Sequence, residues 1–556
     1  NAVLAGGWII FIFSLLSLKW DITPEKRHSL SDLSREQLGK LRRELYVEVY
    51  LSGEDMPPAF RRLQEHLKDL LNAFMRMAPE EMFSYRFLSP MKEEFSVRDQ
   101  KKYLRHLAEQ GIMPTRLHYK EGGKEIETWV FPSVKVRYGN REKVFSLIQG
   151  KRQASAEEIL NQSLENLEYL FLSQIQSWIA GHKYRVAMLT EHASLDTLYW
   201  EGVKELLGEN YKVENVSLAE PLNPKIYAAL CLLKPTKPFT EKEKYHLDQY
   251  LLNGGNILLF AEGISLGMED LAGGKEHLLL SQVLGIEDWL FNCGIKILPQ
   301  LLHDTQCAKY PVVMGDLGDR PQIQYPFMPI YPVVNHVAEH PILRNMEALV
   351  FRIASPLDTV SVSGVRKTPF LFSSSQTRIS PVSSIISLSS LHREMLDRKR
   401  FVSQKHVLAY MLEGSFSSLY QHRLLPKGVD SHSFQKRGEG KLMVVGDGDF
   451  LISEKHLGSN KTFPVGFYPF EQRQYGNSRF LEHSLDYMLN EKGAVWLRNK
   501  HVQIRPLDQQ RIREERRMWQ ILNLGIPFMF LFLMGGINFY LRRVRLRNWT
   551  SLREKT

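Results

Sequence analysis

The sequence predicts an α/β protein in which two transmembrane helices flank a large extracytoplasmic body. Three observations support this class: an uncharged apolar run near each end of the chain, alternating strand and helix patterns between them, and a composition typical of globular domains. Apolar residues make up 43% of the 556 residues, and 72 Lys and Arg against 62 Asp and Glu give a net charge of +10. This content of apolar side chains excludes an intrinsically disordered protein and suits several folded domains.

Residues 2–18 form the first apolar run and carry no charged side chain. The run is slightly shorter than the ~20 residues that usually span a bilayer, and the chain opens with Asn rather than Met. We therefore expect residues 1–18 to be the end of a transmembrane helix that meets the membrane surface at Trp20. A cleaved signal peptide is the alternative, but no small-residue cleavage site follows the run.

A first α/β domain is expected over residues 19–150. Ser31 and Ser34 can cap its first helix, and a β-α-β unit follows in which the helix repeats its apolar residues at three- and four-residue steps. A further helix and two or three antiparallel strands complete the domain, with turns at 121–123 and 139–140. The strand, helix, strand, helix and antiparallel strands are expected over residues 46–51, 57–74, 82–88, 96–110 and 116–149.

An amphipathic helix over residues 151–180 links this domain to a second one, expected over 181–510. The second domain begins with alternating strands and helices, and its strands are almost continuously apolar. Such strands are typical of a parallel sheet with helices on both faces, so we expect a doubly wound fold. The alternating elements are expected over residues 184–189, 195–207, 211–218, 228–233, 240–252 and 256–261.

The regular pattern weakens over residues 300–440, which we interpret as a loop-rich insertion. Prolines alternate with aromatic residues over 321–332, and this segment could dock a peptide, although a polyproline-like loop packed along the domain is favoured. A strand over 441–445, a Gly-Asp-Gly-Asp turn and a closing helix over 479–489 complete the domain.

The second transmembrane helix is expected over residues 518–541, which contain no Asp, Glu, Lys or Arg. A basic tail over 542–556 follows it, whereas the preceding segment mixes arginines with Glu514 and Glu515. Because basic residues favour the cytoplasmic side, we expect a cytoplasmic C-terminus. Two spans then place the intervening body in the periplasm and anchor the protein in the inner (cytoplasmic) membrane.

The sharpest enzymatic pattern is Gly263-Ile264-Ser265-Leu266-Gly267, a G-x-S-x-G that follows an apolar strand. In a hydrolase, this pattern lifts the serine on a strained turn that leads at once into a helix. Here, glycines soon interrupt the following residues, so an ordinary turn is favoured over catalysis. If Ser265 were a nucleophile, its base could be His303, His336 or His483.

The sequence gives little support for a metal site. Asp447 and Asp449 could share a cation, but a glycine turn in which both accept backbone N–H bonds is favoured. His182, Glu191 and His192 lack the spacing of a zinc helix, which favours a solvated loop. We therefore expect no catalytic residue, no metal and no cofactor.

Other partner classes can be set aside in the same way. No G-x-x-x-x-G-K-[ST] phosphate loop occurs, and the basic residues form no stripe that would indicate nucleic-acid binding. The three cysteines contain no CxxC pair. Cys293 and Cys307 could bond in a periplasmic body, Cys231 is expected to be buried, and free cysteines are the default.

Seven ordered stretches carry a family resemblance, and they lie at residues 21–41, 237–260, 340–360, 411–423, 446–453, 475–508 and 519–543. These stretches resemble the GldG family, the gliding-associated auxiliary, or substrate-binding, component of an ABC transporter in Bacteroidota. The resemblance covers nearly the whole chain and includes both terminal spans.

The resemblance implies a non-catalytic periplasmic body similar in fold to class I glutamine amidotransferases, without their nucleophilic cysteine. It also implies two partners, a multispan permease and a cytoplasmic ATPase, and a role in gliding motility and envelope function. The turn Thr190-Glu191-His192-Ala193 departs from the Gly-His-Gly-Glu pattern of the family, which puts the role of this turn in doubt. A membrane-anchored serine hydrolase and a structural envelope scaffold are the alternatives.

The second span is expected to contact helices of the permease. Its glycines allow close approach of another helix, and its asparagines can form hydrogen bonds across an interface. The expected contact residues are Asn523, Gly525, Gly535, Gly536 and Asn538.

Overall fold

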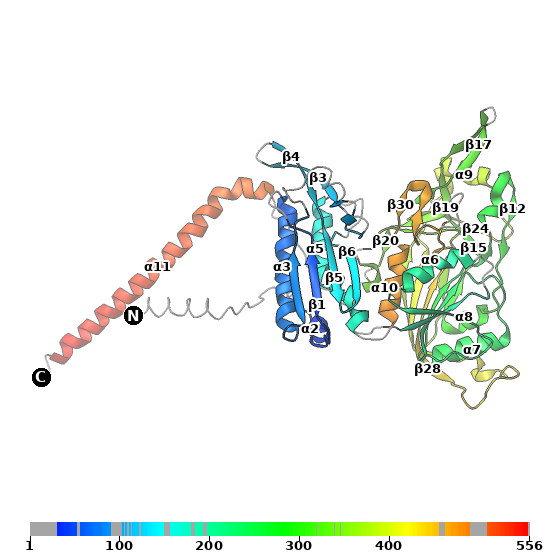
Figure 1. The fold of residues 1–556 in the computed structure, drawn as a ribbon, viewed down its shortest axis with the longest axis horizontal. Helices are drawn as coiled ribbons and strands as arrows, with labels where there is room; N and C mark the ends of the chain where they lie inside the picture. Colours follow the sequence, from blue (N-terminus) through cyan, green and yellow to red (C-terminus); the bar gives the residue numbers. More distant parts are fainter. Residues whose placement is uncertain are drawn as a thin grey trace. The chain divides into compact units, whose positions relative to one another are not determined.

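The computed structural model forms two compact units, residues 1–501 and 502–556 (Figure 1). Each unit is described separately below. The structure describes residues 30–553 except 53–55, 91–102, 105, 108–109, 113, 122–123, 149–155, 180–183, 193–196, 209, 318–319, 339, 345, 455–461 and 490–508. The expected first span over residues 1–18 lies outside the described residues.

The first unit begins with the expected β-α-β motif. Helix α2 (Asp32–Gly39) is capped by the Ser31 side chain, which accepts the Ser34 N–H. Strands β1 (Leu45–Val49) and β2 (Phe83–Phe87) are parallel and are joined by α3 (Pro58–Met77). The apolar stripe of α3 is buried against the sheet at Phe60, Leu63, Leu67, Leu71 and Phe74.

Four strands, rather than two or three, fill the antiparallel region. Strands β3 (Thr115–Glu121) and β4 (Lys124–Val130) form a separate hairpin. Strands β5 (Ser133–Tyr138) and β6 (Arg141–Ser146) extend the first sheet to the order β2-β1-β5-β6. The turn at Gly139-Asn140 lies where the sequence predicted it, but short segments between turns are hard to divide into strands. Most of the helix expected over 96–110 lies outside the described residues.

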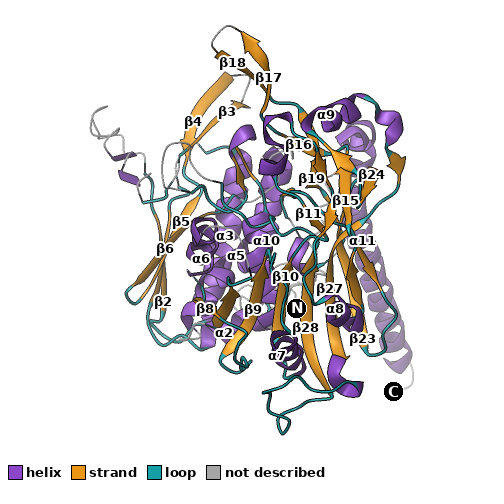
Figure 2. Cartoon of the chain, turned by 90° about the vertical axis from the view of Figure 1, so that its right-hand side faces the viewer, coloured by secondary structure: helices purple, strands orange, loops and turns teal. Residues whose placement is uncertain are grey.

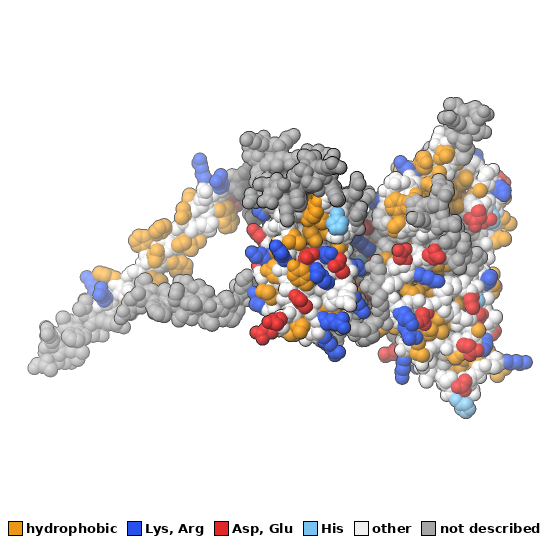
Figure 3. All heavy atoms as spheres, in the orientation of Figure 1, with side chains coloured by type: hydrophobic (Ala, Val, Ile, Leu, Met, Phe, Trp, Pro, Cys, Tyr) orange, Lys and Arg blue, Asp and Glu red, His pale blue; other side chains and the backbone are white. Residues whose placement is uncertain are grey.

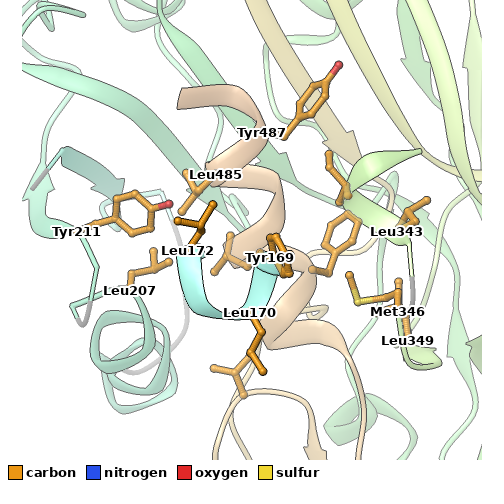
Figure 4. Packing of buried hydrophobic residues seen from close by; sticks show 14 of the residues in the cluster. Tyr169, Leu170, Leu172, Leu207, Tyr211, Leu343, Met346, Leu349, Leu485 and Tyr487 are labelled. Atoms are coloured by element: carbon orange, nitrogen blue, oxygen red, sulfur yellow. The ribbon is translucent and has the colours of Figure 1, made fainter. Parts of the chain in front are cut away.

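Helix α5 (Ala156–Ile179) lies within the range expected for the linking helix and joins the two sheets of the unit. Its Phe171 packs edge-on against Phe74 of α3, with ring centroids 6.0 Å apart. On the side of the second sheet, Leu172 lies among Leu207, Tyr211 and Leu485 (Figure 4). One continuous hydrophobic core therefore extends from the first sheet to the second.

The second sheet confirms the parallel arrangement that the apolar strands predicted. Its main path runs β14-β22-β27-β28-β10-β9-β7-β8, in which β14 is Ile295–Ile297, β22 is Leu357–Thr359 and β27 is Val407–Ser417. Strands β28, β10, β9, β7 and β8 are parallel neighbours, and β27 is antiparallel to β28. The five parallel strands are β7 (Arg185–Leu189), β8 (Lys212–Val216), β9 (Tyr227–Leu233), β10 (Asn256–Phe260) and β28 (Arg437–Val445).

Helices cover both faces of this sheet (Figure 2). On one face, Cys231 and Leu258 join a core with α6 (Thr197–Gly208) and α10 (Asn477–Leu489). On the other face, Leu230 and Ile257 join a core with α7 (Glu241–Leu252) and α8 (Glu287–Cys293). Alternate residues of one strand thus enter opposite cores, which explains why the strands are apolar at nearly every position.

Residues 300–440 contain more regular structure than we expected. The stretch includes long strands, of which β27 (Val407–Ser417) is part of the main sheet and β23 (Val365–Phe372) pairs with β27. The segment of alternating proline and aromatic residues is not a polyproline-like loop, because it contains β18 (Arg320–Gln324) and β19 (Phe327–Val334). Proline removes a backbone donor but keeps its carbonyl, and Pro332 accepts the Phe351 N–H at 2.8 Å.

The other strands of this region form small separate sheets. Three-stranded sheets run β15-β24-β26 and β16-β19-β21, and a third group of strands forms two-stranded pairs. The strands of the two three-stranded sheets, beside β19, are β15 (Gln300–Asp304), β24 (Gln376–Pro381), β26 (Val402–Ser403), β16 (Cys307–Lys309) and β21 (Leu349–Val350).

The second unit contains α11 (Gln509–Arg553), a helix of 45 residues. Within it, Glu515–Arg543 is long and apolar enough to span a membrane, in agreement with the predicted span over 518–541. None of this window is buried inside the structure. Figure 3 shows hydrophobic side chains along the middle of α11 and basic side chains towards its ends.

Candidate functional site

Charged side chains gather at the carboxyl ends of three neighbouring strands of the second sheet. Lys234 follows β9, Glu262 follows β10 after one residue, and Asp447 and Asp449 lie in the turn after β28. Because these strands are parallel, their carboxyl ends meet at one edge, where doubly wound proteins commonly bind ligands. We call Lys234, Glu262, Arg352, Asp447 and Asp449 the strand-end cluster.

Lys234 connects the ends of all three strands. Its ammonium Nζ lies 2.5 Å from Asp449 Oδ1 and 3.6 Å from Glu262 Oε1. The second carboxylate oxygen of Glu262 accepts the Gly448 N–H at 2.6 Å. Only 13% of the Lys234 side chain and 7% of the Glu262 side chain are exposed, so these ion pairs are shielded from water.

Asp447 connects the turn to a neighbouring segment. It is fully buried, and its carboxylate accepts the backbone N–H groups of Asp449 at 2.8 Å and Arg352 at 2.5 Å. The guanidinium of Arg352 lies 3.0 Å from the carboxylate of Glu454. Asp447 therefore acts as the turn-stabilising acceptor that the sequence favoured over a metal ligand.

Burial shifts the titration of the cluster towards neutral carboxyl groups. It raises the pKa of Glu262 to about 7, although the neighbouring Lys234 opposes the shift. It also raises the pKa of Asp447 well above its ordinary value, and repulsion from Asp449 adds to this effect. Burial alone would lower the pKa of Lys234, but the nearby carboxylates outweigh it and raise that pKa. Lys234 therefore stays charged.

The backbone around the cluster is held in unusual conformations. Lys234 and Ile353 have φ values of 44° and 56°, in the left-handed region that side chains rarely adopt. A Cβ at Gly448 would lie 2.2 Å from Glu262 Oε2, so this position must be glycine for the turn to approach Glu262. Such strain persists only where the surrounding contacts impose it.

This geometry supports a clamp between strand ends better than it supports catalysis. A carboxyl group with a pKa near 7 would suit proton transfer, but Glu262 is only 6% exposed and its two oxygens face Lys234 and the Gly448 N–H. Among the described residues, no group of three or more His, Cys, Asp and Glu side chains could hold a metal ion. We therefore assign no metal to the cluster.

The turn after β7 is built differently from our expectation of a solvated loop. His192 is buried, stacks on Phe239 with ring centroids 4.0 Å apart, and contacts the Lys237 carbonyl through Nδ1. Its Nε2 lies 3.1 Å from Glu243, which also caps α7 in a box with Thr240. The prediction for His192 was wrong because the sequence does not reveal the aromatic partner.

The other two residues of the predicted group are Glu191 and His182. Glu191 is exposed and accepts the Ser217 hydroxyl at 2.7 Å, as a solvated loop would allow. His182 lies outside the described residues.

Ser265 does not lie on a hydrolase elbow. It belongs to the two-residue strand β11 (Ile264–Ser265), which pairs with β13 (Leu280–Ser281). A 3₁₀ helix follows only from Met268, so the strand-serine-helix geometry of an elbow is not formed. His277 contacts the backbone carbonyl of Ser265 rather than its hydroxyl.

The three histidines proposed as bases for Ser265 lie on three different elements. His303 is buried with its Nδ1 2.8 Å from Glu394, and burial lowers its pKa to about 3. His483, on α10, contacts the Ile342 carbonyl through Nδ1. His336 lies on the short strand β20 (His336–Val337), paired with β23. The three cysteines are free and buried, as expected by default.

The proposed contact residues on the second span are available to a partner. Asn523, Gly525, Gly535, Gly536 and Asn538 all lie within the exposed part of α11. A Cβ added at any of the three glycines would meet no other atom within 4 Å. This surface of α11 is open to a partner.

The site residues predicted from the sequence did not include Lys234, Glu262 and Arg352. A signal for two of them existed, because Lys234 and Glu262 are charged residues directly behind strands that are otherwise apolar. Parallel strands end at one edge, so such residues are expected to meet. Arg352 follows a separate short strand and had no comparable signal.

Comparison with known proteins gives one informative match. A family model described as an ABC-type uncharacterized transport system matches residues 183–484, which is more than half of the chain. A second model, described as a domain of unknown function, matches residues 24–137. No curated protein matches. Among solved structures, the mmIFT52 N-terminal domain is 14% identical over 55% of this chain and 97% of that chain, with a TM-score of 0.32, too low to carry an argument.

Proposed function

Because the chain belongs to the family described as an ABC-type uncharacterized transport system, we propose that it is the membrane-anchored auxiliary subunit of an ABC transporter. In this proposal, two spans, residues 1–18 and 518–541, anchor the protein in the inner membrane. The body between them lies in the periplasm, and the basic tail over 542–556 lies in the cytoplasm. The partners are a multispan permease and a cytoplasmic ATPase.

The family match carries this proposal, and α11 supports it. The match covers the whole doubly wound sheet and its strand-end cluster, while α11 supplies a window that could cross a membrane. Four arginines follow the expected span closely, at positions 542, 543, 545 and 547. They support a cytoplasmic C-terminus, because basic residues near a span favour the cytoplasmic side.

The protein needs a separate source of energy. Its sequence contains no phosphate loop of the G-x-x-x-x-G-K-[ST] type. We infer that ATP is hydrolysed by the cytoplasmic partner and that movements of the permease reach the body through the spans. In this role, the strand-end cluster keeps the sheet rigid, since it clamps three strands to one another.

Purification from native membranes tests the proposal. The intact chain carrying an affinity tag is extracted in mild detergent, and the eluate is analysed by mass spectrometry and for ATPase activity. A permease and a nucleotide-binding subunit, together with vanadate-sensitive ATPase activity, are expected. Recovery of the chain alone, or only with envelope proteins, would support a structural scaffold instead.

The resemblance to the GldG family extends the proposal to gliding motility and envelope function. Genetics can test this step separately. Deleting the chain and deleting the ATPase are expected to cause the same defect in surface movement or envelope integrity. A defect that follows loss of the chain but not loss of the ATPase would contradict the auxiliary role.

A further inference from the structure

The side-chain amides of the proposed second span lie on one side of the helix. Gln520, Asn523 and Asn538 carry the only side-chain amides between residues 518 and 541, and this segment contains no Ser or Thr. At ~100° per residue, the three side chains fall within an arc of about 60° on α11. We call these three residues the amide stripe.

Pro527 lies on the same side of the helix and adds a backbone acceptor to the stripe. It is inside α11, and proline has no N–H to donate to the carbonyl four residues earlier. That carbonyl belongs to Asn523. The amide stripe therefore combines three side-chain amides with a carbonyl that has lost its helical donor.

These groups are poorly suited to contact with lipid. Asn523 is six residues from the middle of the Glu515–Arg543 window, about 9 Å along the axis, and therefore lies well within a bilayer core about 30 Å thick. In hydrocarbon, polar groups need hydrogen-bond partners from protein. The whole window is exposed in the structure, so a partner must come from outside the described chain or from a second copy of it.

The glycines divide between two sides of the helix. Gly535 is three residues before Asn538 and flanks the amide stripe, where it leaves room for a close helix. Gly525 and Gly536 are eleven residues apart, about three full turns, and lie on the side opposite the stripe. The five expected contact residues therefore do not form a single surface.

We propose that the amide stripe, with Gly535 beside it, is the surface of α11 that binds a permease helix bearing amide or hydroxyl side chains. This inference rests on the proposed function, which supplies the permease. The chemistry of the stripe selects the kind of helix, since a purely apolar helix would leave the amides and the Asn523 carbonyl without partners. Gly525 and Gly536 are excluded from this contact.

Matched double variants of the full-length tagged chain test this assignment in native membranes. Asn523→Leu with Asn538→Leu removes two of the three amides, and Gly525→Leu with Gly536→Leu alters the opposite side. The amide variant is expected to reduce recovery of the permease about tenfold, which is the scale of two interhelical hydrogen bonds. The glycine variant is expected to keep recovery within about twofold of the unmodified chain.

Photo-crosslinking gives a readout that does not depend on affinity. A crosslinking amino acid is placed at Leu531, on the side of the amide stripe, or at Met529, which lies about 160° away around the helix. Both residues are exposed, at 65% and 55%. Crosslinks to the permease are expected from position 531 and not from position 529.

The outcomes separate this inference from the proposed function. If the unmodified chain recovers the permease but only the glycine variant loses it, or only position 529 crosslinks, the assignment of the face is overturned and the auxiliary role stands. Crosslinks from position 531 to a second copy of the chain would also overturn it. Failure of the unmodified chain to recover any permease would overturn the proposed function and this inference together.

Discussion

At the scale of single residues, Lys234 is the cation on which the strand-end cluster depends. Replacing it by methionine would keep most of the side-chain volume but leave the carboxyl groups of Glu262 and Asp449 buried without their partner. We expect Lys234→Met to lower the free energy of unfolding by about 3–5 kcal/mol, because an unpaired buried charge is costly. Chemical denaturation of the full-length chain in detergent, followed by tryptophan fluorescence, measures the change.

Lys237 provides the control for this substitution. It is exposed and lies three residues further along the chain. Lys237→Met is expected to change the free energy of unfolding by no more than about 0.5 kcal/mol, as is usual for surface positions. Equal effects of the two substitutions would show that the cluster does not clamp the strand ends.

Glu262 should make stability depend on pH. Its pKa is raised by burial from 4.5 to about 7, so the folded chain keeps a proton that the unfolded chain loses in this range. Stability is therefore expected to fall as pH rises from about 4.5 to 7. Glu262→Gln removes this titration and should flatten the slope, measured from denaturation midpoints at several pH values. Part of the slope should remain, because Asp447 titrates in the same direction. An unchanged slope would contradict the assignment.

Ser265 is expected to be chemically ordinary. It is exposed on a short strand, and no described contact joins its hydroxyl to a histidine. A fluorophosphonate probe should therefore label the chain and its Ser265→Ala variant equally weakly. Labelling that disappears in the variant would revive the serine hydrolase alternative.

At the scale of elements, close contact between α7 and β28 depends on glycine. A Cβ at Gly438 would lie 1.7 Å from the Leu252 carbonyl oxygen at the end of α7. We expect Gly438→Ala to move the helix away from the sheet and to destabilise the chain by about 1–3 kcal/mol. Gly208→Ala is the control, because its Cβ would meet nothing within 4 Å and alanine favours the helix that it ends. Both changes are measured by denaturation, and a loss of similar size in the control would contradict the steric explanation.

The elements differ in how far the sequence could predict them. Helix α5 and the parallel strands followed from apolar periodicity, because each buries side chains in a regular pattern. The strands of residues 300–440 were missed, since many are short and contain prolines whose carbonyls still serve as acceptors. The strand-end cluster was largely missed as well, because it joins residues such as Lys234 and Asp449 that are far apart in the sequence.

At the scale of the whole molecule, each compact unit has a different source of stability. The body has hydrophobic cores on both faces of its large sheet and a charged clamp at one edge. Helix α11 has an exposed apolar window instead, which water would not stabilise. A membrane and partner helices would cover this apolar window. The auxiliary role would therefore combine a rigid body with a helix whose stability depends on the membrane and on partner helices.

The last prediction concerns the orientation of the chain in the membrane. Its three cysteines are buried, so a single cysteine introduced on the surface can be labelled selectively. Lys427 is exposed in the body, and Ser551 lies in the basic tail. Because the arginines after the span favour the cytoplasm, we expect a membrane-impermeant maleimide to label Lys427→Cys in intact spheroplasts and Ser551→Cys only after lysis. The unmodified chain is the control and should remain unlabelled. The reverse pattern would place the body in the cytoplasm, where it could not serve as a periplasmic subunit.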